Sequence, residues 1–172
     1  MAFKVKKQDK YLGLALYTYL RYNSNVKPSM VQTKDEDTSC YEMLGATGDT
    51  FYLYIKYRAT VNQTLRDGSL TWALKLTDND KCKIEECANT GRKIFIVVVC
   101  CNNDIDDSYF VVLTYNEYLT IKNQAITTIK LASSKVRFEK KLSIIKDRTV
   151  CFTVERNRIE KNLLEIADAI AT

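Results

Sequence analysis

Two segments decide the fold: Phe-Tyr-Leu-Tyr-Ile-Lys-Tyr-Arg at residues 51–58 and Lys-Ile-Phe-Ile-Val-Val-Val-Cys at residues 93–100. Side chains alternate between the two faces of a strand. In the first segment one face is apolar, while the other ends in Lys56 and Arg58. The second segment is apolar on both faces, which is typical of a central strand covered on each side. We therefore expect both segments to be strands of one sheet.

The sequence around these segments predicts a mixed fold. Residues 40–44 and 51–58 flank a turn with two glycines, which indicates a β-hairpin. Apolar residues at three- and four-residue intervals predict a helix over residues 9–22, and capping residues at 77–80 predict a second helix that Gly91 ends. Further patterns predict a surface loop at residues 32–39, strands at 70–76, 109–113, 126–131, 136–138 and 150–154, a helical turn at 115–121 and a last helix at 156–171. This order predicts an α/β (α+β) fold in which helices flank a mixed central β-sheet.

Length and composition fit a single domain over residues 1–172. The chain is 46% hydrophobic and 27% charged, as ordinary globular proteins are. Its longest apolar run, at residues 94–101, is far shorter than the roughly 20 residues of a membrane-spanning helix, and no signal-peptide pattern precedes it. We therefore expect a cytoplasmic protein without a membrane partner.

The chain contains no histidine and six cysteines. Without histidine, Ser-His-Asp and Cys-His catalysis are excluded, and a zinc site at Cys82 and Cys87 is disfavoured. Because nothing directs the chain to an oxidising compartment, we expect free thiols and not disulfides. Cys100 and Cys151 are expected to be buried.

A helix, a hairpin whose second strand carries Lys56, another helix and a buried apolar strand follow one another over residues 9–113. This order resembles the core of the PD-(D/E)XK nuclease superfamily, and the strands and helix at residues 124–172 lie beyond it. The resemblance implies a restriction-endonuclease-like core and a metal-dependent endonuclease that uses Mg²⁺. In such a site two acids hold the metal, which generates hydroxide and polarises the phosphate, and a lysine stabilises developing charge.

The resemblance also assigns individual residues. Lys56 matches the lysine, and Glu42 on the first hairpin strand matches the first acid, so these two are the candidate catalytic residues. Tyr54 stands where the second acid is expected, and its oxygen, neutral near pH 7, is a poor Mg²⁺ ligand. Asp49 in the turn, together with Glu42, forms the candidate metal site. The departure at Tyr54 indicates a degenerate motif.

Structural interpretations stand beside these catalytic ones. Lys56 fits a solvated strand face, and Glu42 opposite it fits a cross-strand ion pair worth up to about 1 kcal/mol. Tyr54 and its tyrosine neighbours fit sheet packing as well as base stacking.

The net charge is +5, from 26 basic and 21 acidic residues. Part of the basic excess is clustered, and such clusters either contact phosphates or form a solvated basic surface. The clusters are Lys4, Lys6, Lys7 and Lys10 near the start, and Lys135, Arg137, Lys140, Lys141, Lys146 and Arg148 later in the chain. The candidate nucleic-acid contacts are Arg58, Lys135, Arg137, Lys140 and Lys141.

Two functions follow from the sequence. The first is a nucleic-acid-associated protein with a nuclease-like core, either a Mg²⁺-dependent phosphodiesterase or a degenerate relative that only binds. The second is a non-enzymatic regulatory or interaction module that contacts a protein partner or forms a homo-oligomer. The departure at Tyr54 favours a protein that does not catalyse cleavage. The basic clusters are compatible with a nucleic-acid ligand under both functions.

Overall fold

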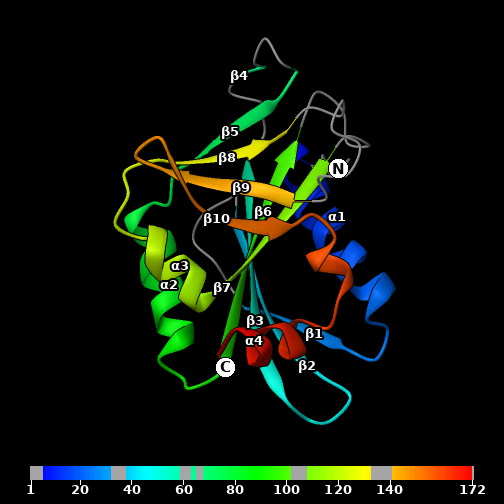
Figure 1. Cartoon of the computed structure of the whole chain (residues 1–172). Coiled ribbons are helices and arrows are strands. Elements are labelled where there is room, and N and C mark those ends of the chain that lie inside the picture. The colour runs from blue at the N-terminus through cyan, green and yellow to red at the C-terminus, as the bar shows by residue number, and fades with distance from the viewer. Residues whose placement is uncertain are drawn as a thin grey trace.

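The computed structural model describes residues 6–31, 38–58, 63–64, 68–101, 108–132 and 141–171. These residues form two five-stranded sheets with four α-helices around them (Figure 1). Sheet A contains, in spatial order, β1 (Lys27–Val31), β2 (Thr38–Leu44), β3 (Thr50–Arg58), β6 (Lys93–Cys101) and β7 (Ser108–Thr114). Sheet B contains β10 (Thr149–Glu155), β9 (Lys141–Lys146), β8 (Thr127–Leu131), β5 (Leu70–Leu74) and β4 (Gln63–Thr64).

Sheet A is mixed, as the sequence predicts. Strands β1, β2 and β3 are antiparallel neighbours, whereas β3 and β6 are parallel and are connected through α2 (Asp78–Ala88). Strand β7 then returns antiparallel to β6. The prediction of a buried central strand is confirmed, because no residue from Ile94 to Cys101 is more than 2% exposed.

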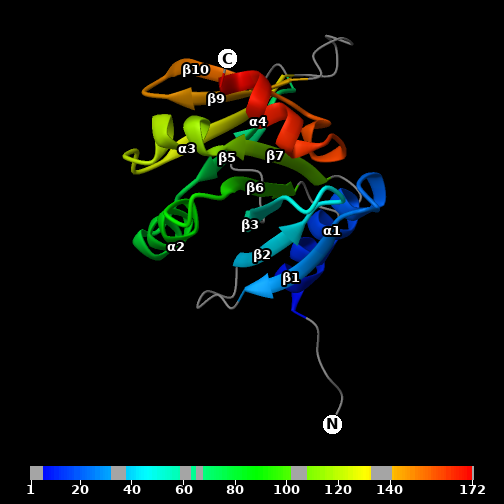
Figure 2. The same ribbon diagram turned by 90° about the horizontal axis from the view of Figure 1, so that it is seen from below.

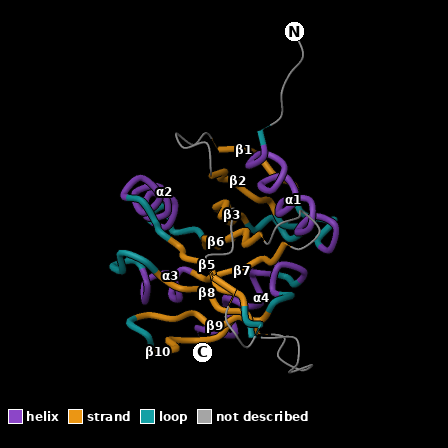
Figure 3. The backbone as a smooth tube through the Cα atoms, turned by 90° about the horizontal axis from the view of Figure 1, so that it is seen from above, coloured by secondary structure: helices purple, strands orange, loops and turns teal. Residues whose placement is uncertain are grey.

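Helices cover both faces of sheet A. Helices α1 (Lys7–Tyr22) and α4 (Leu163–Ala171) lie on one side, together with the 3₁₀ helix η2 (Arg158–Glu160). Helices α2 and α3 (Tyr115–Ile121) lie on the other side (Figure 3). The α/β fold class with a helix-flanked mixed sheet is therefore confirmed.

Sheet B supplies the rest of the cover on the α2 side (Figure 2). Its strands are antiparallel, and its inner face contributes Trp72, Ile129 and Ile144 to the core that it shares with sheet A. The sequence pattern predicted only one sheet. Sheet B was missed because β5 pairs with β8 across an intervening helix, strand pair and helix, and such non-local pairing leaves no local pattern.

Several local predictions need correction. The loop predicted at residues 32–39 is wrong at Thr38 and Ser39, which are buried in β2, and its other residues lie outside the described part. Strand β9 was not predicted, and the last helix begins at Leu163 instead of residue 156. Cys100 is buried as expected, whereas Cys151 is exposed. The strand predicted at residues 136–138 lies outside the described residues.

The other predicted elements have the expected type. Helix α1, the β2–β3 hairpin, strand β5, helices α2 and α3, and strands β7, β8 and β10 occur close to their predicted bounds. Gly91 adopts φ +79° directly after α2, which is the left-handed conformation that ends many helices. Among the described residues, no helix combines the length and the apolar character needed to cross a membrane.

Candidate functional site

The site that contains Lys56 lies toward the carboxyl ends of the parallel strands β3 and β6. Lys56 is opposite Thr38 of β2 and beside Val98 of β6. Its side chain points to the face of sheet A that α2 and sheet B cover, so Lys56 is only 5% exposed. The interpretation of Lys56 as a residue on a solvated strand face is therefore wrong.

Asp80, in the first turn of α2, is the partner of Lys56. The Lys56 Nζ atom is 2.8 Å from Oδ2 and 3.1 Å from Oδ1 of Asp80. The Tyr54 hydroxyl donates a hydrogen bond to Oδ1 at 2.6 Å. Thr77 donates to Oδ2 from its backbone N–H at 2.7 Å and from its hydroxyl at 2.9 Å. Asp80 is fully buried within this set of donors.

The contacts of Asp80 determine its charge and its availability to a metal. Burial alone would raise its pKa, but hydrogen bonds from Lys56, Tyr54 and Thr77 outweigh burial, so the pKa of this carboxyl lies below its ordinary value. A carboxylate has about four lone-pair positions, and the donors around Asp80 occupy them. Asp80 is thus an ionised carboxylate with no vacant position for a cation.

The sequence indicated Asp80 only as a helix-capping residue. That function is present, because the Thr77 hydroxyl accepts a hydrogen bond from the Asp80 backbone N–H and the two residues form a capping box. Its second function, as the counter-ion of Lys56, joins positions 24 residues apart and has no sequence signal.

The structure does not bring Glu42 to Lys56. Glu42 is opposite Tyr52, four residues along β3 from Lys56, which is about 13 Å along a strand. Its carboxylate forms an ion pair with Arg92, and Arg92 also donates a hydrogen bond to the Tyr52 hydroxyl at 3.2 Å. The interpretation of Glu42 and Lys56 as a cross-strand ion pair is therefore wrong.

Asp49 is also remote from Lys56. It precedes β3 in the hairpin turn, seven residues before Lys56, which is roughly 20 Å along an extended chain. Its carboxylate accepts a hydrogen bond from the Thr47 hydroxyl at 2.6 Å. The residues present near Lys56 therefore do not fit a Mg²⁺ ion, and no cluster of three potential ligands occurs among the described residues.

Arg58 lies two residues beyond Lys56 on the same face of β3. Its Nε–H group is buried and meets no acceptor among the described residues. Arg58 pairs in register with Cys100, and Cys100 pairs with Tyr109 of β7, so the three form one row across sheet A. Burial raises the pKa of Cys100, which keeps this thiol neutral.

A second guanidinium stands at the other end of this row. Arg156, which is exposed, lies over the Tyr109 ring at 5.0 Å, and the buried Trp72 ring packs 5.6 Å from the same tyrosine. We call Arg58, Tyr109 and Arg156 the arginine row. Tyr109 and Arg156 were not predicted as site residues, and Arg156 was expected inside a helix.

The other predicted nucleic-acid contacts are only partly described. Lys141 is exposed at the start of β9, where it is opposite Glu155 of β10. Lys135, Arg137 and Lys140 lie outside the described residues. Arg58 and Lys141 are therefore the predicted contacts whose positions are known.

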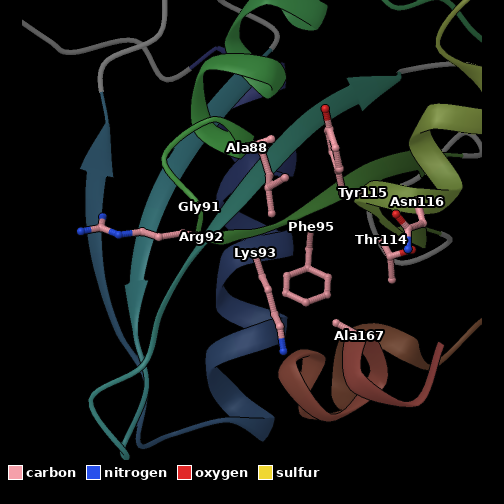
Figure 4. Close-up of a pocket in the computed structure, with 10 residues that line it drawn as sticks. Ala88, Gly91, Arg92, Lys93, Phe95, Thr114, Tyr115, Asn116 and Ala167 are labelled. Atoms are coloured by element: carbon pink, nitrogen blue, oxygen red, sulfur yellow. The ribbon is translucent and has the colours of Figure 1, made fainter. Parts of the chain in front are cut away.

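A pocket of about 290 Å³ lies at the opposite end of β6, between α2, α3 and α4. Its walls are largely apolar, with Phe95 at the centre, Lys93 extending toward α4 and Arg92 directed away (Figure 4). Lys93 forms an ion pair with Asp168, and Arg92 with Glu42. Both cations at its edge therefore already have partners.

No protein-family model matches the chain, and no curated protein shows significant similarity to it.

Proposed function

We propose that this chain is a nucleic-acid-binding protein with a PD-(D/E)XK nuclease-like core that has lost the ability to cleave. The order α1, β1–β3, α2 and β6, with β3 and β6 parallel and with β4 and β5 of sheet B inserted before α2, supports the nuclease-like core. The observation that carries the loss of cleavage is the buried ion pair between Lys56 and Asp80.

Hydrolysis of a phosphodiester in such a core requires two metal-binding carboxylates beside the lysine. Here Glu42 is about 13 Å away along the sheet, and Tyr54 occupies the position expected for the second acid. The Asp80 carboxylate, which contacts Lys56, is saturated by hydrogen bonds. Lys56 therefore stabilises the fold and does not stabilise charge on a phosphate during hydrolysis.

The arginine row supports binding of a phosphate backbone. Planar guanidinium groups donate paired hydrogen bonds to phosphate oxygens, and the half-buried Arg58 and the exposed Arg156 lie at the two ends of one row. The Tyr109 ring contacts both Arg156 and the buried Trp72, so it holds the Arg156 guanidinium in the row. The net charge of +5 favours the same polyanionic partner.

Fluorescence anisotropy with labelled single-stranded DNA, duplex DNA and RNA tests this proposal. Arg58→Gln and Arg156→Gln should each weaken binding, and the salt slope should fall by about 0.9 for each duplex phosphate that a variant no longer neutralises. Arg21→Gln is the matched control, because Arg21 is exposed in the last turn of α1, outside the arginine row, and this variant loses the same charge. An equal decrease in affinity in all three variants would mean that the arginine row does not bind nucleic acid.

A cleavage assay with Mg²⁺ or Mn²⁺ tests the other half of the proposal. We expect no metal-dependent cleavage of DNA or RNA by the wild-type chain. Cleavage that Lys56→Ala abolishes, with the fold intact by circular dichroism, would instead establish an active nuclease.

The second candidate function is a protein-interaction module, and strand β1 favours it. β1 is an edge strand of sheet A, and Lys27, Pro28, Ser29 and Met30 are all exposed. Met30 is 66% exposed, and exposed edges pair readily with another strand. Light scattering over a range of concentrations tests this alternative. Self-association that Met30→Lys removes, combined with no salt-sensitive binding of nucleic acid, would favour it over the first proposal.

A further inference from the structure

Two thiols that the proposed function does not use lie next to each other in the core between α2 and sheet A. Cys40 is on β2, and Cys87 is in the last turn of α2. Their Sγ atoms are 3.9 Å apart, and the residues are 0% and 4% exposed. The two positions are 47 residues apart in sequence, so this contact depends on how α2 packs on the sheet.

The packing of α2 explains why these sulfur atoms meet. Asp80, Ile84 and Cys87 are its buried residues, and their spacing of four and three places them on one face of the helix. Asp80 bonds to Tyr54, and Tyr54 is the cross-strand partner of Cys40. The Asp80 contacts thus set the rotation of α2 that directs Cys87 at Cys40.

The surroundings make the two thiols chemically different. The hydrogen bond to Cys87 raises the pKa of Cys40, and burial raises it further. The same hydrogen bond lowers the pKa of Cys87 against the effect of burial, and the Lys83 ammonium group lowers it further. Either sulfur can donate in this contact, and we take Cys87, the more exposed of the two, as the sulfur that reacts first.

We propose that Cys40 and Cys87 are a redox-active pair that closes reversibly to a disulfide, with a peroxide as oxidant. The Cys87 thiolate attacks one peroxide oxygen, which breaks the O–O bond and gives a sulfenic acid and hydroxide. The Cys40 thiol then attacks the sulfenic sulfur, forms the S–S bond and releases its proton. Each hydroxide leaves as water, so two thiols and one hydrogen peroxide give one disulfide and two water molecules.

The geometry makes closure a local event. A disulfide has an S–S length of about 2.05 Å, so the sulfur atoms must approach by about 1.9 Å. Rotation of a cysteine side chain moves its sulfur by more than this distance. The other four cysteines are not placed to form such a pair. Cys100 and Cys101 are adjacent on β6 and belong to cores on opposite faces of sheet A. Cys82 and Cys151 are exposed.

Peptide mapping tests the proposal. The variant Cys82→Ser/Cys151→Ser removes the exposed thiols and prevents intermolecular disulfides. After treatment with hydrogen peroxide, alkylation with N-ethylmaleimide and digestion with trypsin without reduction, residues 35–56 and 84–92 should appear as one cross-linked peptide. Each of these peptides contains a single cysteine, so the assignment is unambiguous. Cys100 and Cys101 should be recovered alkylated, and dithiothreitol should separate the pair.

An equilibrium measurement complements the peroxide treatment, because an oxidant reaches a buried sulfur atom slowly. Prolonged incubation of the folded protein in glutathione buffers allows exchange, in which the Cys87 thiolate displaces one glutathione and Cys40 displaces the second. More than half of the pair should be disulfide in the most oxidising buffer, and Cys40→Ser should leave only a glutathione adduct on Cys87. Recovery of both thiols fully alkylated from this buffer, together with no cross-linked peptide after peroxide, would overturn the proposal.

Discussion

At the residue scale, Lys56 and Asp80 form a buried ion pair in which Nζ lies 2.8 Å from Oδ2. Both are almost completely buried, and removing one partner of a buried pair leaves an uncompensated charge. Tyr54 and Thr77 complete the pair by donating to the same carboxylate. These contacts connect β3 to α2.

Asp80→Asn should therefore destabilise the protein strongly. We expect the free energy of unfolding to fall by about 3–5 kcal/mol, because Lys56 would remain buried without its counter-ion. Asp78→Asn is the matched control, since Asp78 is fully exposed in the same turn of α2, and it should change stability by no more than about 0.5 kcal/mol. Urea denaturation measures both variants, and similar values for the two would contradict this account of Asp80.

The lowered pKa of Asp80 also predicts a dependence on pH. An aspartate in the unfolded chain has a pKa of about 3.9. Because the folded pKa is lower, the contribution of Asp80 is complete above the unfolded pKa and is lost as the pH falls through the folded pKa. The stability difference between the wild type and Asp80→Asn should be constant from about pH 5 to 7 and should shrink below about pH 4. A difference that stayed constant throughout acid titration would refute this prediction.

At the element scale, the amino end of α2 depends on its capping box. Thr77 accepts from the Asp80 backbone and donates to the Asp80 carboxylate, so Thr77→Ala should lower the free energy of unfolding by about 1 kcal/mol. Thr77→Ser is the control and should retain most of the stability, because serine keeps the hydroxyl. Denaturant titration followed by circular dichroism distinguishes the two, and equal destabilisation would mean that the methyl group and not the hydroxyl matters.

The elements that could be predicted from the sequence are those with a strong local pattern. Helix α1 and the β2–β3 hairpin have strong local periodicity, strand β6 is a continuous apolar run, and all three were predicted. The burial of Lys56 was not, because its face of β3 is covered by α2 and by sheet B, whose strands come from distant parts of the chain. The partner of Lys56 was missed for the same reason. Alternation along β3 predicts two faces but does not predict what lies over each one.

At the scale of the whole molecule, the two sheets share one core. Trp72 of β5 is fully buried between them, and its Nε1–H group donates to the Cys101 carbonyl of β6 at 2.8 Å. Its ring also packs against Tyr109 of β7. These contacts join sheet B to β6 and β7 of sheet A. Separation of the two sheets would therefore expose the core that they share.

This shared core predicts that the chain unfolds in one cooperative transition. Trp72 is the single tryptophan of the chain, so its fluorescence reports the junction of the two sheets, whereas far-ultraviolet circular dichroism reports all secondary structure. Both probes should give the same denaturant midpoint and the same slope, as two-state unfolding requires. Trp72→Phe, followed by circular dichroism alone, should lower the midpoint because the hydrogen bond to Cys101 is removed and a cavity remains. A fluorescence transition at lower denaturant than the dichroism transition would show instead that sheet B detaches before sheet A unfolds.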